Sequence, residues 1–452
     1  MRADLPRRPR PFGLAAALLL GAALLPVPVL AQSDQQLAPQ ARLTVTQQIA
    51  QEDGDLIGIT PIDLSLQTGT RSQSLTFALS APLRQGDPDD DGFLGLGDIQ
   101  AQLAYRRFVR NASFETQMRY READLDRLIF FDDDLDSIVT LDGGRRADSS
   151  IRTGYAFGSQ ARLGGEFDLG YSRRDYSDTT DPSLTDSETV DANARIFLEL
   201  TPLIRARILA SALETDTDGG TDTRRRRVGA GASMQVNRLV NLDVELAQSR
   251  IRREDDVDGT VEETDGISVR SSLTYLRNDG EYALSVSSDP GTEGRRDRIQ
   301  LGRNFERPGY DFSLSGGFTR LDGGDLDPTA RLSYQRNLDR QSRLQASLQR
   351  EAVSDIEGNE AINTSLSSRY DRQLTERSSI GLGLFYRESE VQRGDREDAR
   401  QAALDVSYNH SIVGDISVVA GINVTRARQS DGTRDDTERV YIGLSRSFDF
   451  LP

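Results

Sequence analysis

The sequence contains no cysteine, no tryptophan and no lysine, and its single histidine is His410. Without cysteine there is no disulfide framework and no thiolate metal site. A Ser-His-Asp hydrolase would have to use His410, but the adjacent Ser411 would point to the opposite face of a strand. These absences leave the chain without a recognisable catalytic arrangement, and we expect no enzyme activity.

Positive charge is scarce relative to negative charge. The 55 basic residues, all arginine, are outnumbered by 72 acidic ones, and the formal net charge is -17. Non-specific nucleic-acid binding needs a basic surface, so we expect no nucleic-acid partner. Beyond residue 31, no apolar run reaches the roughly 18 residues of a membrane-spanning helix. If the mature chain enters a membrane, it must cross with strands.

Residues 1–31 have the features of a secretory signal peptide. A region with four arginines precedes the apolar segment 14–30, and Ala31 is an acceptable residue at a cleavage site. The alternative, a single membrane anchor, is disfavoured by Pro26 and Pro28 inside the apolar segment. We expect residues 32–40 to form a short periplasmic segment and residues 41–452 to form the main domain.

The stretch 437–450 shows the pattern that organises the rest of the chain. Apolar residues alternate there with small or polar ones: Val440, Ile442, Leu444, Phe448 and Phe450 share one parity. Because side chains of a strand alternate between its faces, such a stretch is apolar on one side and polar on the other. The pattern recurs back to segments such as 41–51 and 61–69. It predicts an all-β fold of about 22 strands, within a range of about 18 to 24.

The expected connections alternate between short and long. Short ones include Ser159-Gln160, Asn237-Arg238 and Asn278-Asp279, and long ones include 85–98, 125–148, 177–187, 215–222 and 253–264. A soluble β-sandwich shows the same face alternation, but outer-membrane barrels combine it with short periplasmic turns and longer extracellular loops. The sequence therefore predicts an antiparallel up-and-down transmembrane β-barrel. An even strand number places both termini in the periplasm.

With the terminal Phe448-x-Phe450, these features make the chain resemble Gram-negative outer-membrane β-barrels of the porin-like class. The resemblance implies a place in the cell outer membrane, contact with lipid and lipopolysaccharide, and a passive channel. It also implies insertion by the barrel assembly machinery, which would recognise Gly443, Phe448 and Phe450 in the last strand. Two features depart from the pattern: the chain ends in Leu451-Pro452, and Arg446 has the apolar parity.

If the apolar parity faces lipid, the other parity lines the lumen. Its charged residues include Arg106, Arg119, Glu166, Asp168, Arg195, Arg205, Arg207, Arg270, Arg331 and Arg369. Unpaired charges are not stable in a dry core, so this face must be in contact with water. The residues either bias a solute path towards anions, with Arg205 and Arg207 beside Arg195 as the strongest candidates, or pair with carboxylates that hold neighbouring strands in register.

The acidic stretch 87–98 has the spacing of a calcium-binding loop. Asp87, Asp89, Asp91 and Asp98 fall at loop positions one, three, five and twelve, and a glycine occupies position six. Such spacing lets oxygen ligands wrap a calcium ion. Asp instead of Glu at position twelve and flanking strands instead of helices depart from an EF-hand, so a solvated acidic loop is the alternative. No cofactor is required.

The sequence thus predicts an outer-membrane channel for passive passage of small or anionic solutes through a charged aqueous lumen. A conduit for exopolysaccharide or capsule export is a second interpretation of an arginine-lined lumen. A structural or adhesive surface barrel with acidic loops is a third. No pattern in the sequence specifies the solute or the oligomeric state.

Overall fold

The structure is a computed structural model, and it describes residues 37–86, 94–125, 144–179, 184–255, 259–291, 294–321, 324–354, 360–393, 398–429, 432 and 434–450. The expected signal peptide, most of the expected periplasmic segment and the centre of the 125–148 connection lie outside the described residues. In the described part of the chain, no helix is long and apolar enough to cross a membrane.

Twenty-three strands follow one another along the chain. Their bounds are Leu37–Glu52 (β1), Asp55–Gly69 (β2), Gln73–Gln85 (β3), Leu94–Leu96 (β4), Ile99–Val109 (β5), Ala112–Asp124 (β6), Arg145–Phe157 (β7), Leu163–Ser177 (β8), Ser187–Thr201 (β9), Ile204–Thr217 (β10), Thr221–Gln235 (β11), Val240–Asp255 (β12), Val261–Arg277 (β13), Gly280–Gly291 (β14), Gly294–Arg307 (β15), Tyr310–Leu321 (β16), Leu326–Asn337 (β17), Ser342–Ser354 (β18), Glu360–Thr375 (β19), Ser378–Arg393 (β20), Ala399–Val413 (β21), Ile416–Gln429 (β22) and Arg434–Phe450 (β23).

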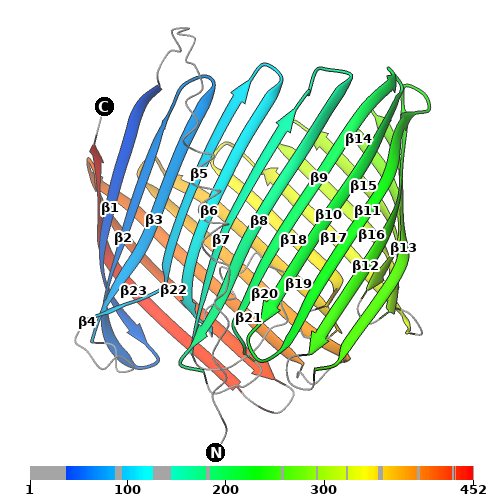
Figure 1. Ribbon diagram of the computed structural model, residues 1–452. Coiled ribbons are helices and arrows are strands. Elements are labelled where there is room, and N and C mark those ends of the chain that lie inside the picture. The colour runs from blue at the N-terminus through cyan, green and yellow to red at the C-terminus, as the bar shows by residue number, and fades with distance from the viewer. Residues whose placement is uncertain are drawn as a thin grey trace, which may run out of the picture. The chain divides into compact units, whose positions relative to one another are not determined.

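These strands form one antiparallel sheet that closes on itself (Figure 1). Each strand pairs with its neighbours in sequence, and β1 pairs with β23 from Ala41 opposite Phe450 to Glu52 opposite Arg439. The short β4 and the following β5 both pair with β3, so they form one wall strand interrupted at Gly97 and Asp98. The wall therefore has 22 strands, which confirms the predicted all-β barrel and its strand number.

The two faces of the wall differ in chemistry. Large apolar side chains such as Leu284 on β14, Leu301 on β15 and Phe318 on β16 are exposed on the outer face. A broad exposed apolar surface of this kind is unfavourable in water and favourable in lipid. The polar residues between them point to the interior. The alternation seen in the sequence is thus the alternation between lipid and lumen.

The two ends of the barrel differ in their connections. At the upper end in Figure 1, turns such as 110–111, 278–279 and 414–415 have two residues, and β23 finishes at this end. At the other end, connections such as 178–186 and 256–260 are longer. Outer-membrane barrels place short turns in the periplasm, so we refer to the two ends as periplasmic and extracellular.

Several strands continue further at the extracellular end than the sequence pattern predicted. The expected connection 215–222 is reduced to residues 218–220, and β13 begins at Val261 instead of near residue 265. These stretches are rich in Asp, Glu and Thr, which are typical of loops. Strand ends that stand in water above the membrane tolerate such residues, because their backbone pairing is retained without an apolar face.

The prediction that a strand starts at Pro61 is also wrong. β2 begins at Asp55 and passes through Pro61, which lies opposite Pro82 of β3. Proline has no N–H group for a sheet ladder. The pairing of β1 with β2 accordingly skips from Val45 to Gln48.

Candidate functional site in the lumen wall

The register of the strands brings the predicted lumen residues onto one continuous inner face. Arg106 lies opposite Glu115, and Glu166 lies opposite Arg195. Directly opposed residues of antiparallel strands point to the same side of the sheet. The same reasoning places on this face Arg119, Asp168, Arg205, Arg207, Arg270, Arg331 and Arg369.

Most of these arginines are paired with carboxylates of the wall. The pairs are Arg106–Glu115 at 2.7 Å, Arg195–Glu166 at 3.1 Å, Arg207–Asp243 at 2.6 Å, Arg270–Asp289 at 3.3 Å, Arg331–Glu351 at 3.3 Å and Arg369–Asp371 at 3.1 Å. Arg205 lies 4.9 Å from the ring centroid of Phe197. Arg119 stands opposite Gln102, and Asp168 stands opposite Asn193. The pairing supports a wall-bracing role for most of the set.

An ion-pair network joins β10, β11 and β12. Arg207 donates hydrogen bonds to both oxygens of Asp243, at 2.6 and 2.7 Å, and its Nη2 donates to Glu245 at 3.1 Å. Arg227 donates to the other oxygen of Glu245, which is only 7% exposed. Two arginines and two carboxylates therefore neutralise one another. Arg207 is not available to a passing anion, although the sequence made it a leading candidate.

Among the described residues, Arg225 and Arg298 are further lumen arginines without such a partner, and the sequence pattern did not single out these two. Arg225 lies between Leu213 and Ile251, and Arg298 lies between Ser287 and Thr319. Among the described residues, neither guanidinium has a hydrogen-bond acceptor or an ion-pair partner. In the unbroken run of arginines 224–227 no alternation is visible, so only the strand register identifies Arg225 as inward-facing.

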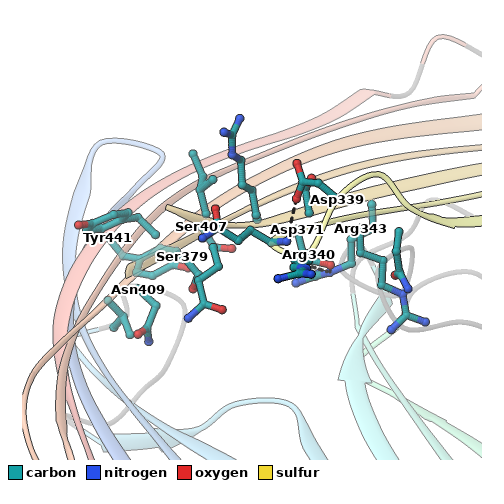
Figure 2. Close-up of a pocket in the computed structure, with 18 residues that line it drawn as sticks. Asp339, Arg340, Arg343, Asp371, Ser379, Ser407, Asn409 and Tyr441 are labelled. Carbon is teal, nitrogen blue, oxygen red and sulfur yellow. Dashed lines mark hydrogen bonds and ion pairs between the residues drawn. The ribbon is translucent and has the colours of Figure 1, made fainter. Parts of the chain in front are cut away.

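A pocket of about 740 Å³ hollows the inner wall near the periplasmic end. Figure 2 shows Arg343, Asp371, Ser407 and Asn409 around it, from β18, β19 and β21. The turn before β18 contributes Asp339. Hydrogen bonds from Ser342 and from the Gln341 amide hold the pKa of the Asp339 carboxyl below its usual value. The pocket thus combines guanidinium, carboxylate, hydroxyl and amide groups.

Tyr441 of β23 closes one side of this pocket (Figure 2). It lies opposite Gly421 of β22, where an added Cβ would come within 2.5 Å of the tyrosine hydroxyl. Because Gly421 has no side chain, the ring of Tyr441 can lie against the wall at this position. The ring also packs against the buried Ala50, Ile57 and Ile59, so it joins the last strand to the first two.

The expected assembly residues lie on the closing strand. Phe448 and Phe450 stack at 6.4 Å on the outer face, and the guanidinium of Arg446 lies 4.7 Å from the Phe448 ring centroid. This cation–π contact stabilises the charge of Arg446, which lies on the otherwise apolar outer face of the strand. Gly443 lies on the inner face, opposite Gln48 of β1. Recognition of these residues by the assembly machinery stays a prediction.

The candidate calcium ligands Asp87, Asp89 and Asp91 lie outside the described residues. Asp98 is described, and its Oδ1 accepts a hydrogen bond from the backbone of Asp124 at 3.4 Å. In the described segments, no group of three or more His, Cys, Asp or Glu residues has an arrangement suited to a metal ion. Calcium binding by the 87–98 loop stays a prediction.

Comparison with known proteins identifies structures that share this fold. No protein-family model matches the sequence, and no curated protein matches it either. The FrpB iron transporter of Neisseria meningitidis (F5-1 variant) is similar over 92% of this chain and 83% of its own, with a TM-score of 0.60 and 8% identity. The ferric-catecholate import receptor Fiu of E. coli K12 gives 0.59 over 92% and 82%, with 8% identity.

The siderophore receptor PirA of Acinetobacter baumannii is a further structural relative. It gives a TM-score of 0.53 over 91% of this chain and 80% of its own, with 10% identity. Identities this low show the fold alone. The closed wall, its lipid-facing exterior and these likenesses define the fold of a Gram-negative outer-membrane β-barrel, and the outer membrane is its location.

Proposed function

We propose that the protein is a passive channel of the outer membrane for small hydrophilic solutes, including anions. The observation that carries the proposal is the inner wall, where ionised groups of both signs recur around the barrel and many, such as Arg106 and Arg369, are exposed. Charges of this kind are stable only in contact with water or with partners. A barrel of 22 strands is wide enough to enclose an aqueous lumen.

Active transport is the second candidate, because the structural relatives are described as iron transporters and siderophore receptors. In 22-stranded outer-membrane transporters, a plug fills the lumen. The described residues of this chain form the wall and its turns. We prefer the passive channel because the charged inner wall is sufficient to account for it.

Export of an anionic polysaccharide is a third candidate, and the pocket beside Tyr441 favours it. Arg343, Ser407 and Asn409 offer guanidinium, hydroxyl and amide groups near the periplasmic end, where an exported polymer would enter. We also expect contact with lipopolysaccharide around the outer face. These assignments rest on side-chain chemistry and on the orientation of the barrel.

The decisive experiment is single-channel recording of the refolded mature chain in a planar bilayer, with and without calcium. A steady, ohmic conductance is the expected result, and calcium would change it only if the 87–98 loop binds the ion. Protein that is folded by its heat-modifiable migration on a gel, yet conducts no current, would overturn the passive channel. Binding of a ferric siderophore by such protein would favour the receptor, and binding of an acidic oligosaccharide would favour the exporter.

A further inference from the structure

Two unneutralised arginines occupy equivalent positions within their strands of the lumen wall. Arg225 is the fifth residue of β11, and Arg298 is the fifth residue of β15; both strands start at the extracellular end. They lie on the inner face by register, whereas the adjacent Arg226 lies on the outer face opposite Ala212. Among the described residues, Arg225 and Arg298 have no acceptor for their guanidinium groups.

Charged residues of both signs surround the two arginines. The charges that act on Arg225 are those of Asp289, Arg270, Arg296 and Arg227, and those acting on Arg298 include Arg296, Asp289, Glu351 and Arg331. Among the described residues, these two groups comprise four arginines, of which Arg227, Arg270 and Arg331 are paired with carboxylates, and the two carboxylates Asp289 and Glu351.

Both of these carboxylates already have a partner. Asp289 accepts from Arg270, and Glu351 accepts from Arg331. Among the described residues, the positive charge of Arg225 and Arg298 is therefore not paired with a carboxylate. This contrasts with Arg207 and Arg227, whose charges are matched by Asp243 and Glu245.

The wall between the two arginines is continuous. Arg270, Ser287 and Arg298 occupy one rung across β13, β14 and β15. Adjacent strands are about 4.8 Å apart, so the backbones of Arg270 and Arg298 are about 10 Å apart. Hydroxyl groups such as that of Ser287 add hydrogen-bonding capacity between the arginines. The result is a strip of inner wall, formed by β11 to β17, that presents several guanidiniums to the lumen.

We propose that this strip is an anion-binding station, and that the channel selects solutes carrying two or more phosphate or carboxylate groups. The proposal rests on the passive-channel function above and specifies its substrate class. Planar guanidiniums form forked hydrogen bonds to phosphate and carboxylate. A solute with several anionic groups can engage Arg225 or Arg298 together with neighbouring arginines of the strip, whereas chloride is attracted only by the local positive potential.

The test compares wild type with Arg225→Gln, Arg298→Gln and the double variant in planar bilayers. Arg226→Gln is the matched control, since it removes the same charge from the next residue on the opposite face. Two quantities are measured: the chloride-to-potassium permeability ratio in a salt gradient, and the block of current by tripolyphosphate or citrate added to both sides. Heat-modifiable migration on a gel checks that each variant is folded.

We expect the permeability ratio to fall about fourfold for each lumen charge removed, because a unit charge about 8 Å away in water roughly doubles the local concentration of chloride and roughly halves that of potassium. Block by tripolyphosphate weakens roughly tenfold per arginine, as for the loss of one charge-assisted hydrogen bond. Arg225→Lys should keep the wild-type permeability ratio, because lysine has the same charge. It should still show weaker block by tripolyphosphate than wild type, because an ammonium group cannot form the paired hydrogen bonds of a guanidinium. Arg226→Gln behaves as wild type. Equal effects of tripolyphosphate and citrate identify the anionic charge as the recognised feature.

A conducting double variant with unchanged selectivity and unchanged block would overturn the station and leave the channel intact. If wild type is folded but silent, the channel fails, and calorimetry with tripolyphosphate on the detergent-solubilised protein tests the station directly. Binding lost in the double variant and kept in Arg226→Gln would still support the station. Equal binding by wild type, the double variant and Arg226→Gln, or no binding by any of them, would overturn it.

Discussion

Arg42 of the first strand and Asp449 of the last strand form an ion pair across the barrel seam, with Nε and Oδ1 2.7 Å apart. Two further side-chain bonds accompany it: Thr44 to Ser447 at 3.0 Å and Thr46 to Ser445 at 2.9 Å. The ion pair is more than half exposed, and exposed pairs contribute at most about 1 kcal/mol. The closure of the barrel therefore depends chiefly on the β1–β23 backbone ladder.

A side chain at Gly443 should open this seam. A Cβ there would collide with the backbone carbonyl oxygen of Gln47 on β1, and backbone cannot move aside as a flexible side chain can. We expect Gly443→Val to destabilise the folded barrel by about 1–3 kcal/mol, the usual effect of overpacking. Urea unfolding in lipid vesicles measures this change. The control is Gly316→Val, because the nearest atom to a Cβ at Gly316 is 3.9 Å away; equal losses would contradict the seam argument.

Removing the charge of Glu245 should lower the stability of the barrel and raise its selectivity for chloride over potassium. Glu245→Gln leaves Arg207 and Arg227 without their shared carboxylate, and breaking a buried pair costs about 3 kcal/mol. The unfolding midpoint should fall, while the chloride-to-potassium permeability ratio should rise because positive charge is released into the lumen. Glu166→Gln is the comparison, since its exposed partner Arg195 should make the loss less than about 1 kcal/mol.

The ring of Tyr441, rather than its hydroxyl, should stabilise the wall. The ring covers Gly421 and packs against Ala50, Ile57 and Ile59, so we expect Tyr441→Ala to cost about 2 kcal/mol, reduced from full-core values because the ring is only half-buried. Tyr441→Phe keeps the ring and should unfold at nearly the wild-type urea concentration. A large loss in the phenylalanine variant would show that the hydroxyl carries the effect.

Acid should weaken one periplasmic turn through Asp279. The hydrogen bond from Arg303, at 2.8 Å, holds the pKa of the Asp279 carboxyl below its usual value. Arg303 is itself positioned by the rings of Tyr282 and Phe305, whose centroids lie 4.2 and 4.1 Å from its guanidinium carbon. A depressed pKa contributes stability above the unfolded-state pKa of about 3.9, and this contribution is lost as the pH falls through the folded-state pKa.

Asp279→Asn should therefore unfold more readily than wild type at pH 7, and the difference should shrink below about pH 4. Unfolding midpoints measured from pH 3 to pH 7 test this expectation. Asp311→Asn, on the next hairpin, is the control for general acid effects. A difference between Asp279→Asn and wild type that does not vary with pH would contradict the assignment.

The barrel could be predicted from the sequence because adjacent residues of each strand face different surroundings. Lipid favours apolar side chains on one face, and the lumen favours polar side chains on the other. A single strand such as β23 already shows both faces, so fold class and strand number could be predicted. Strand ends could not be predicted as well. At Pro61 and at the acidic start of β13, local composition resembles a loop, while pairing with the neighbouring strands continues the sheet.

The candidate site was predicted only in part. Parity identified Arg195 and Arg207 as inward-facing, but the sequence cannot reveal that Glu166 and Asp243 lie within bonding distance, because pairing depends on the register between strands. The same register exposes Arg225, whose inward orientation is hidden within four consecutive arginines. Charge compensation is thus a property of neighbouring strands rather than of any one segment.

The seam also has a consequence for the time course of folding. Arg42 and Asp449 are separated by 407 positions in the chain, so β1 meets its final partner only when the last residues have arrived. Until then β1 has an unpaired edge, which is a template for association with other chains. Contacts between such distant segments also form slowly, because the entropy of closing the loop must be lost first. A chaperone that shields the β1 edge should therefore increase the yield of closed barrels more than one that shields any hairpin in the middle of the chain.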